Sequence, residues 1–234
     1  MTLEHVLIVY QIIAFLFAIS VHESAHAWMA NLRGDPTARM LGRITLNPIK
    51  HIDLIGTILL PAIAAFSGRG ILGWVKPTPV NPNNFKNPVL DDVLTSVVGP
   101  ISNFAVAFGA VTALLAVKSS SVSGRVIVSA LANGILPGSN SPLEPVCLLF
   151  FALLEINVLL AVFNLIPVPP LDGSHVIRHF LPEGIRQAYD MLGTIGLLLL
   201  FLLGGRVLSV LFVPTRNLFV AASYAKHPNE KSEF

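Results

Sequence analysis

Four apolar segments of this chain are close to or above the roughly 20 residues that a helix needs to cross a bilayer. They cover residues 6–30, 93–117, 146–166 and 191–213. The whole chain is 53% hydrophobic and only 12% charged, whereas soluble domains carry about 25% charged residues. Because a spanning segment must satisfy its backbone polar groups internally, we predict an all-α, multi-pass membrane protein with about four transmembrane helices.

A fifth apolar stretch, residues 54–66, is too short for a full crossing and contains Gly56 and Pro61. Its length is typical of a re-entrant or interfacial segment. Residues 76–92 hold so many Pro and Asn residues that no regular helix is expected there. Composition predicts loops in four places: 31–53, 76–92, 119–145 and 167–173.

The charged residues are few and give a net charge of +2. We therefore expect no nucleic-acid partner, and we interpret the basic residues as markers of membrane topology. The single cysteine, Cys147, excludes an internal disulfide and a cysteine-rich metal site. We expect one intramembrane domain over residues 1–225, with its first segment retained and no soluble domain attached, and a disordered polar tail at 226–234.

The first apolar segment ends in His22-Glu23-Ser24-Ala25-His26, which is an H-E-x-x-H pattern. On a helix, both imidazoles project from one face and can bind a single Zn²⁺, and Glu23 lies beside the metal, where it can activate a water molecule. Ionisable side chains inside a membrane segment are costly and usually functional. The alternative is that the end of the helix merely emerges into the polar interface.

A zinc site in a hydrolase needs a third protein ligand, and Asp172 is the natural candidate because it follows the third apolar segment. The loop after the first segment carries four basic residues and the N-terminal flank carries none, which predicts an outside N-terminus and a histidine pair near the cytoplasmic side. Asp172 reaches that side only if an odd number of crossings separates the first and third segments, and residues 93–117 supply one. Residues 54–66 should therefore enter the membrane and return.

Together these residues resemble the site-2 protease family of intramembrane zinc metalloproteases. Three motifs within residues 5–180 carry the resemblance: H-E-S-A-H at 22–26, G-P-I-S-N at 99–103 and N-L-I-P-V-P-P-L-D-G at 164–173. The N-P-I-K-H stretch at 47–51 resembles the compact prokaryotic branch, which has no PDZ or CBS domain.

The resemblance implies one Zn²⁺ per chain, bound by His22, His26 and Asp172, with Glu23 as the catalytic residue and Asn164 as a ligand of the substrate backbone. The expected function is hydrolysis of peptide bonds in or near transmembrane segments, as in regulated intramembrane proteolysis. The expected partners are a transmembrane protein substrate and the lipid bilayer of the cell membrane. The alternatives are a zinc transporter and a catalytically silent protein that binds membrane helices. Glu23 favours hydrolysis because a carrier does not need an acid beside the metal.

Asn103 is a second candidate for substrate binding, although buried Asn residues also hold membrane helices together. A strand-like piece at 42–46 could pair edge to edge with an unwound substrate. Both roles of Asn103 stay open at this point. The sequence does not define an oligomeric state.

Four further ionisable residues are harder to assign. We interpret His51 as a supporting or interfacial residue near the metal site. His175 and His179 could form a second metal site, but their position beside Arg178 favours solvated side chains. Glu155 lies within the third apolar segment, where it is a proton relay, a gate or the partner of a basic side chain.

Overall fold

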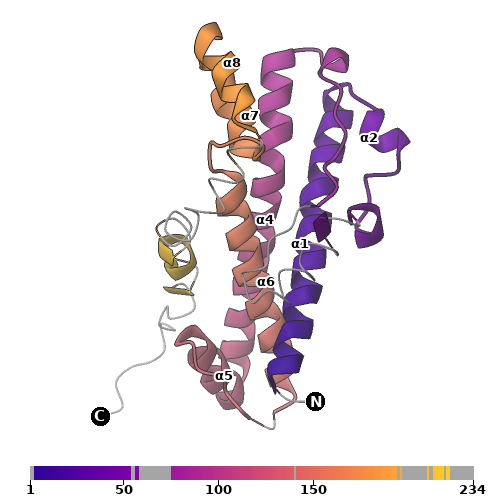
Figure 1. Ribbon diagram of the computed structural model, residues 1–234. Helices are drawn as coiled ribbons and strands as arrows, with labels where there is room; N and C mark the ends of the chain where they lie inside the picture. The colour runs from indigo at the N-terminus through magenta and orange to yellow at the C-terminus, as the bar shows by residue number, and fades with distance from the viewer. Residues whose placement is uncertain are drawn as a thin grey trace.

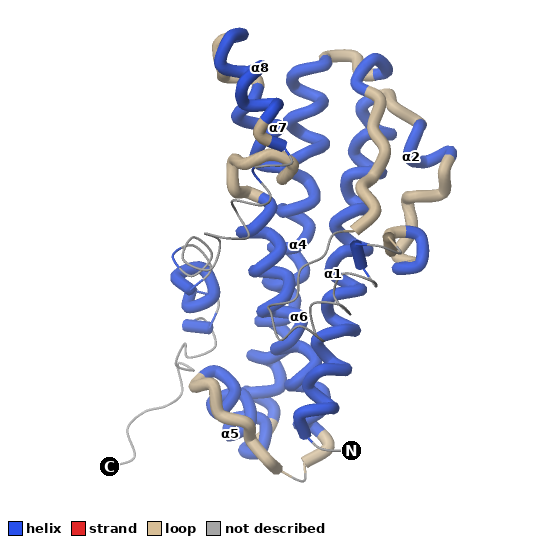
Figure 2. The backbone as a smooth tube through the Cα atoms, viewed as in Figure 1, coloured by secondary structure: helices blue, strands red, loops and turns tan. Residues whose placement is uncertain are grey.

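The computed structural model describes residues 3–53, 56–57, 75–139, 141–193, 196, 210, 213–218 and 220–221. Within these residues all regular secondary structure is helical, which confirms the predicted fold class (Figure 2). The elements are α1 (Leu3–Arg33), α2 (Thr37–Met40), η1 (Pro48–Lys50), η3 (Pro82–Asn84), α4 (Pro88–Ser120), α5 (Val122–Ala132), α6 (Leu143–Asn164), α7 (Asp172–Arg178) and α8 (Glu183–Met191).

Three long helices form the centre of the molecule. Helix α4 contacts both α1 and α6, and α1 also contacts α6, so the three form a bundle (Figure 1). They coincide with the first three predicted apolar segments, and each is long and apolar enough to cross a membrane. Most of the fourth predicted segment, 191–213, most of the predicted re-entrant segment, 54–66, and the predicted tail, 226–234, lie outside the described residues.

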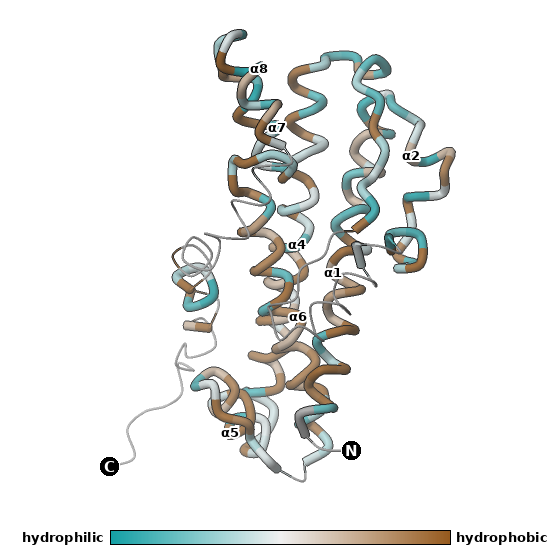
Figure 3. Tube along the Cα trace, in the orientation of Figure 1, coloured by the Kyte–Doolittle hydropathy of each residue, from teal (hydrophilic) through white to brown (hydrophobic). Residues whose placement is uncertain are grey.

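Small side chains lie at the contacts between the long helices. Ala14 and Ala18 of α1, Ala107 of α4 and Ala161 of α6 are fully buried, which lets the helix backbones approach closely. Large apolar side chains such as Ile12 remain exposed on the outer faces. Figure 3 shows apolar residues along the length of the bundle and many hydrophilic residues at the end that carries α2 and α8. This is the distribution expected of helices that contact lipid.

Residues 119–145 contain helix α5, so the prediction of a loop is wrong over these helical residues. The side chain of Ser121 caps α5 by accepting a hydrogen bond from the backbone N–H of Gly124. The buried residues of α5 follow the i, i+3, i+4, i+7 spacing of one helix face: Gly124, Ile127, Val128 and Leu131. This face packs against α4 and α6. The Ser and Gly residues that indicated a loop serve instead as a helix cap and a position of close contact.

The prediction that residues 76–92 hold no regular helix is wrong at the end of that range. Helix α4 begins at Pro88, and the side chain of Asn87 caps it by accepting a hydrogen bond from Leu90 N–H. Proline is favoured at a first helical position, because the N–H that it lacks would have no partner there. Earlier in the range the backbone is irregular apart from the short turn η3.

Buried Asp35 ties the segment after α1 to the segment before α4. It accepts hydrogen bonds from the backbone N–H groups of Thr37 and Asn81 and from Nδ2 of Asn84. Burial opposes ionisation of Asp35, but the hydrogen bonds from Thr37, Asn81 and Asn84 outweigh it and hold the pKa of this carboxyl below its usual range. In Figure 1 the chain that precedes α4 accordingly runs alongside α1.

Candidate active site

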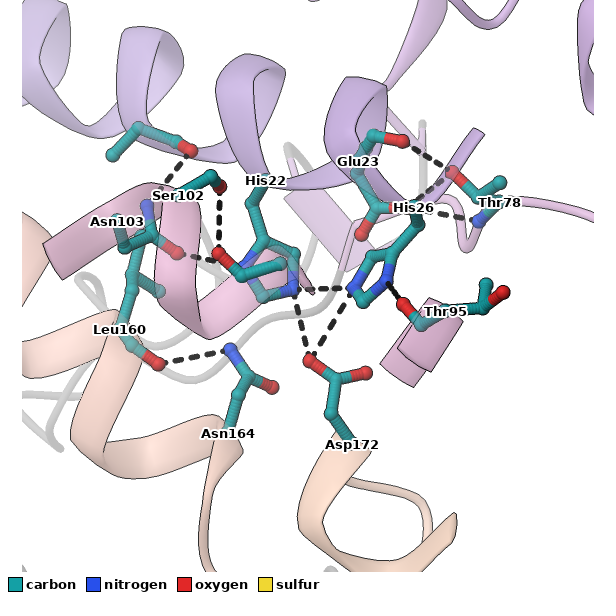
Figure 4. Close-up of polar contacts among 12 residues, drawn as sticks. His22, Glu23, His26, Thr78, Thr95, Ser102, Asn103, Leu160, Asn164 and Asp172 are labelled. Atoms are coloured by element: carbon teal, nitrogen blue, oxygen red, sulfur yellow. Dashed lines mark hydrogen bonds and ion pairs between the residues drawn. The ribbon is translucent and has the colours of Figure 1, made fainter. Parts of the chain in front are cut away.

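The structure brings the three predicted metal ligands together. His22 and His26 lie one turn apart on α1, and Asp172 is the first residue of α7. The two Nε2 atoms are 3.0 Å apart, and Asp172 Oδ2 lies 3.1 Å from Nε2 of His22 and 3.3 Å from Nε2 of His26 (Figure 4). Among the described residues, this is the one group of three or more His, Cys, Asp or Glu side chains close enough to hold a metal ion.

The other nitrogen of each imidazole faces a hydrogen-bond acceptor. His22 Nδ1 lies 2.7 Å from Asn103 Oδ1, and His26 Nδ1 lies 2.6 Å from the carbonyl oxygen of Thr95. The Asn103 amide is oriented by its Nδ2, which donates to the carbonyl of Ala18. Both Nδ1 atoms must therefore carry the proton. This leaves the lone pair of each Nε2 pointing at Asp172, as in histidine ligands of zinc.

These positions fit a zinc ion. Tetrahedral ligands about 2.0–2.1 Å from zinc lie about 3.3 Å from one another, close to the three observed separations of 3.0, 3.1 and 3.3 Å. Asp172 Oδ2 is buried and receives no hydrogen bond within the described part of the chain. With both imidazoles neutral, two nitrogen lone pairs and a carboxylate oxygen converge on one point, and a shared divalent cation would satisfy all three. A zinc ion held by three protein ligands would keep a further position for water, as in catalytic zinc sites.

Helix α4 forms one wall of the site because Gly99 has no side chain. A Cβ atom on Gly99 would overlap the ring of His26 and lie 2.7 Å from Cε1 of His22. The partners of the two Nδ1 atoms, Thr95 and Asn103, lie four residues before and after Gly99 on the same helix. The G-P-I-S-N motif at 99–103 thus provides both a close backbone contact and a partner for one imidazole.

Asp172 is presented by the predicted break after the third long helix. Helix α6 ends at Asn164, the proline-rich turn follows, and α7 begins at Asp172 itself. A Cβ atom on Gly173 would overlap the backbone carbonyl of Leu165, so glycine is needed where α7 turns back onto the end of α6. The predicted break between α6 and α7 therefore positions Asp172 next to the two histidines.

His175 and His179 flank Asp92 of α4. His179 Nε2 lies 2.7 Å from Asp92 Oδ2, and His175 Nδ1 lies 3.5 Å from Asp92 Oδ1. The side chain of His175 is 51% exposed, as the prediction of solvated histidines requires, but that of His179 is only 13% exposed, so the prediction is wrong for His179. The two histidines join α7 to α4 in a link that the sequence did not reveal.

Glu23 is buried next to His26, and its carboxylate contacts Thr78. Glu23 Oε2 accepts hydrogen bonds from the backbone N–H of Thr78, at 2.8 Å, and from the Thr78 hydroxyl, at 2.7 Å (Figure 4). Sequence reasoning missed Thr78, because threonine is neither a metal ligand nor an acid or base. The only signal was its place between Pro77 and Pro79, in a stretch unsuited to a helix.

The two predicted substrate-binding residues occupy different environments. Asn103 is fully buried, and both hydrogens of its Nδ2 are used, by the carbonyl of Ala18 and by Asn157 Oδ1. These contacts favour the role of joining helices and orienting His22. Asn164 is partly exposed at the end of α6, where its Nδ2 donates to the carbonyl of Leu160 (Figure 4). The part of Asn164 in substrate binding stays a prediction.

His51 and the loop at 42–46 are held together beside Glu23. His51 Nε2 donates to the carbonyl oxygen of Thr45, and the Ser24 hydroxyl donates to the same oxygen. His51 is fully buried, which agrees with a supporting role. Residues 42–46 are irregular, so any strand-like pairing there would have to form with the substrate.

Glu155 pairs with a basic side chain, one of the three roles that the sequence left open. Its Oε1 lies 2.7 Å from Nε of Arg216, and the Arg216 guanidinium lies 5.8 Å from the centre of the Phe151 ring. The carboxylate within α6 is therefore neutralised by a residue near the C-terminal end of the chain.

Comparisons with known proteins agree with this geometry. Residues 10–203 match the model of the family described as Peptidase family M50. The chain is 36% identical over 195 residues to a Bacillus subtilis (strain 168) protein named "Putative zinc metalloprotease YwhC", and the match covers 83% of this chain and 79% of that protein. No solved structure matches the chain. From this family match and the convergent zinc ligands, we conclude that the chain is a membrane zinc metalloprotease that belongs to peptidase family M50, the site-2 protease family.

Proposed function

We propose that the protein is an intramembrane endopeptidase that hydrolyses peptide bonds in or near the transmembrane segments of other membrane proteins. The observation that carries the proposal is the convergence of His22 Nε2, His26 Nε2 and Asp172 Oδ2, with Glu23 adjacent, on helices long enough to span a bilayer. A site built on such helices is suited to substrates that lie in the same membrane. The proposed role is a step of regulated intramembrane proteolysis.

In this proposal the polar side chains of the site divide the work of hydrolysis. His22, His26 and Asp172 hold the zinc ion, which when bound lowers the pKa of a water molecule and polarises the scissile carbonyl. Glu23 accepts a proton from the attacking water and returns it to the leaving amine. Asn103 and the Thr95 carbonyl keep both imidazoles in the tautomer that leaves Nε2 free.

The substrate must be unwound before it can be cut. The carbonyl groups of a helix in lipid are hydrogen-bonded and dry, so the enzyme must offer alternative partners to an extended peptide. We propose Asn164 and the irregular backbone at 42–46 for this task. They are supported by the partial exposure of Asn164 near the metal ligands and by the contact of Thr45 with Ser24, which directly follows Glu23.

Substitution of Glu23 by Gln tests the proposal. The variant should bind zinc like the native protein but lose proteolysis, because an amide cannot accept the proton. The measurement is the appearance of zinc-dependent fragments when the chain is co-expressed with a library of single-span membrane proteins. Glu183→Gln is the matched control, because Glu183 is an exposed side chain on α8, and it should cut as the native chain does. Undiminished cleavage by Glu23→Gln with normal zinc content would refute the proposal.

A further inference from the structure

Glu23 and Thr78 are joined by hydrogen bonds that the proposed hydrolysis does not by itself explain. Both hydrogen bonds from Thr78 end on the same carboxylate oxygen, Oε2, at 2.8 Å from the backbone nitrogen and 2.7 Å from the hydroxyl. The hydroxyl also lies 3.0 Å from the backbone carbonyl of Glu23. One threonine thus provides two donors to one oxygen of the proposed general base.

The position of Thr78 is fixed by contacts that do not involve Glu23. Pro77 and Pro79 flank it, and a following proline restricts a residue to extended conformations. On one side, Lys76 N–H donates to the carbonyl of His51 at 3.0 Å. On the other side, Asn81 N–H donates to Oδ2 of buried Asp35 at 2.7 Å. The segment is therefore anchored at both ends, and it presents the Thr78 donors to α1 as a preformed site.

A general base must lie within hydrogen-bond reach of the proton that it accepts, so a partner that fixes the glutamate side chain aids catalysis. Its side chain has three rotatable bonds, and a carboxylate free to rotate would spend much of its time away from the attacking water. Hydrogen bonds from an N–H and an O–H to Oε2 fix the side chain and occupy that oxygen. The other oxygen, Oε1, is then the one available to accept a proton.

We propose that Thr78 is a positioning residue, which holds Glu23 Oε2 through its N–H and hydroxyl so that Oε1 faces the water to be activated. This inference rests on the proposed function, because it gives Thr78 a task only if Glu23 is the general base. The competing interpretation is a purely structural contact, in which Thr78 attaches residues 75–80 to α1. The two interpretations differ in what loss of the hydroxyl should change.

Substitutions of Thr78 by Val and by Ser separate these interpretations. Thr78→Val keeps the shape and the N–H but removes the hydroxyl, and Thr78→Ser restores the hydroxyl on a smaller side chain. We expect Thr78→Val to lower kcat about ten- to a hundredfold, the usual range for loss of a supporting partner, with KM and zinc content unchanged. Thr78→Ser should recover most of the loss. Thr112→Val is the matched control on an exposed face of α4, and its kcat should equal that of the native enzyme.

The outcomes distinguish this inference from the proposed function. Native kcat in Thr78→Val would overturn the positioning role, and so would a Thr78→Val variant that loses zinc or unfolds at lower temperature in proportion to its loss of activity. A Thr78→Ser variant as impaired as Thr78→Val would also contradict it. If only the Thr78 prediction fails and Glu23→Gln remains inactive, the proposed function stands. If Glu23→Gln cleaves normally, both are wrong.

Discussion

At the scale of single residues, Asn103 shows how the metal site depends on its surroundings. Its Oδ1 accepts from His22, and its Nδ2 donates to Ala18 of α1 and to Asn157 of α6. One fully buried amide thus orients a zinc ligand and joins three helices. A group with so many buried partners leaves several of them unsatisfied when it is removed.

We therefore predict that Asn103→Ala weakens zinc binding about ten- to a hundredfold, as loss of a ligand's hydrogen-bond partner usually does. The measurement is competition for zinc with a chromophoric chelator. Asn133→Ala is the matched control, because Asn133 is exposed at the end of α5 and its Nδ2 donates to the carbonyl of Ser129 in the same helix. It should bind zinc as the native protein does. Native affinity in a folded Asn103→Ala variant would show that His22 needs no such partner.

The ligands could be predicted from the sequence because zinc accepts few residue types and helical spacing fixes their geometry. The supporting contacts could not, because they use groups that any sequence contains. Thr95 acts through its backbone carbonyl, and Gly99 acts through the absence of a side chain. Asn103 was identified, but its buried position, which favours a supporting role, follows only from the packing of α1, α4 and α6.

At the scale of elements, the position of α7 determines whether the third ligand reaches the histidines. His175 of α7 and His179, which directly follows α7, contact Asp92 of α4, and Arg178 pairs with Asp190 of α8 through two hydrogen bonds of 2.7 and 2.9 Å. The long helices were predictable from their length and composition. These links of α7 to its neighbours were not, because they depend on how α7 packs against α4 and α8 rather than on a pattern in the sequence.

The link between α7 and α4 should depend on pH. The hydrogen bond with Asp92, which outweighs burial, raises the pKa of His175 above its usual value. A histidine with a raised pKa in the folded protein contributes stability while it is protonated. This contribution is complete below the pKa of the unfolded state, about 6.5, and is lost as the pH rises through the pKa of the folded state. Asp92→Asn should thus lower Tm by about 1–3 °C at pH 6, a range set by half-exposed ion pairs, and by less at pH 9.

Thermal unfolding of the zinc-loaded protein at several pH values measures this difference. Asp190→Asn is the control, because its main partner Arg178 stays charged over the whole range, and its Tm difference from the native protein should vary with pH much less than that of Asp92→Asn. If Asp92→Asn lowers Tm by the same amount at pH 6 and at pH 9, the prediction is wrong.

At the scale of the whole molecule, the bundle has two distinct ends. The salt bridge between Arg33 and Asp91 joins the end of α1 to the start of α4, so these helices run in opposite directions. His22 and His26 lie in the second half of α1, which ends at this salt bridge, whereas α5 and the N-terminus lie at the other end of the bundle (Figure 1). The basic residues that follow α1 predict that the end with the salt bridge is cytoplasmic.

This orientation predicts the labelling of two introduced cysteines in intact cells. Lys86 precedes α4 and Ser120 is its last residue, so they lie at opposite ends of a helix long enough to span the membrane. Lys86→Cys should be protected from an impermeant thiol reagent until the membrane is permeabilised, and Ser120→Cys should react at once. The native Cys147 is buried and should contribute little background. The reverse pattern would place the metal site towards the outside and show that these basic residues do not set the topology.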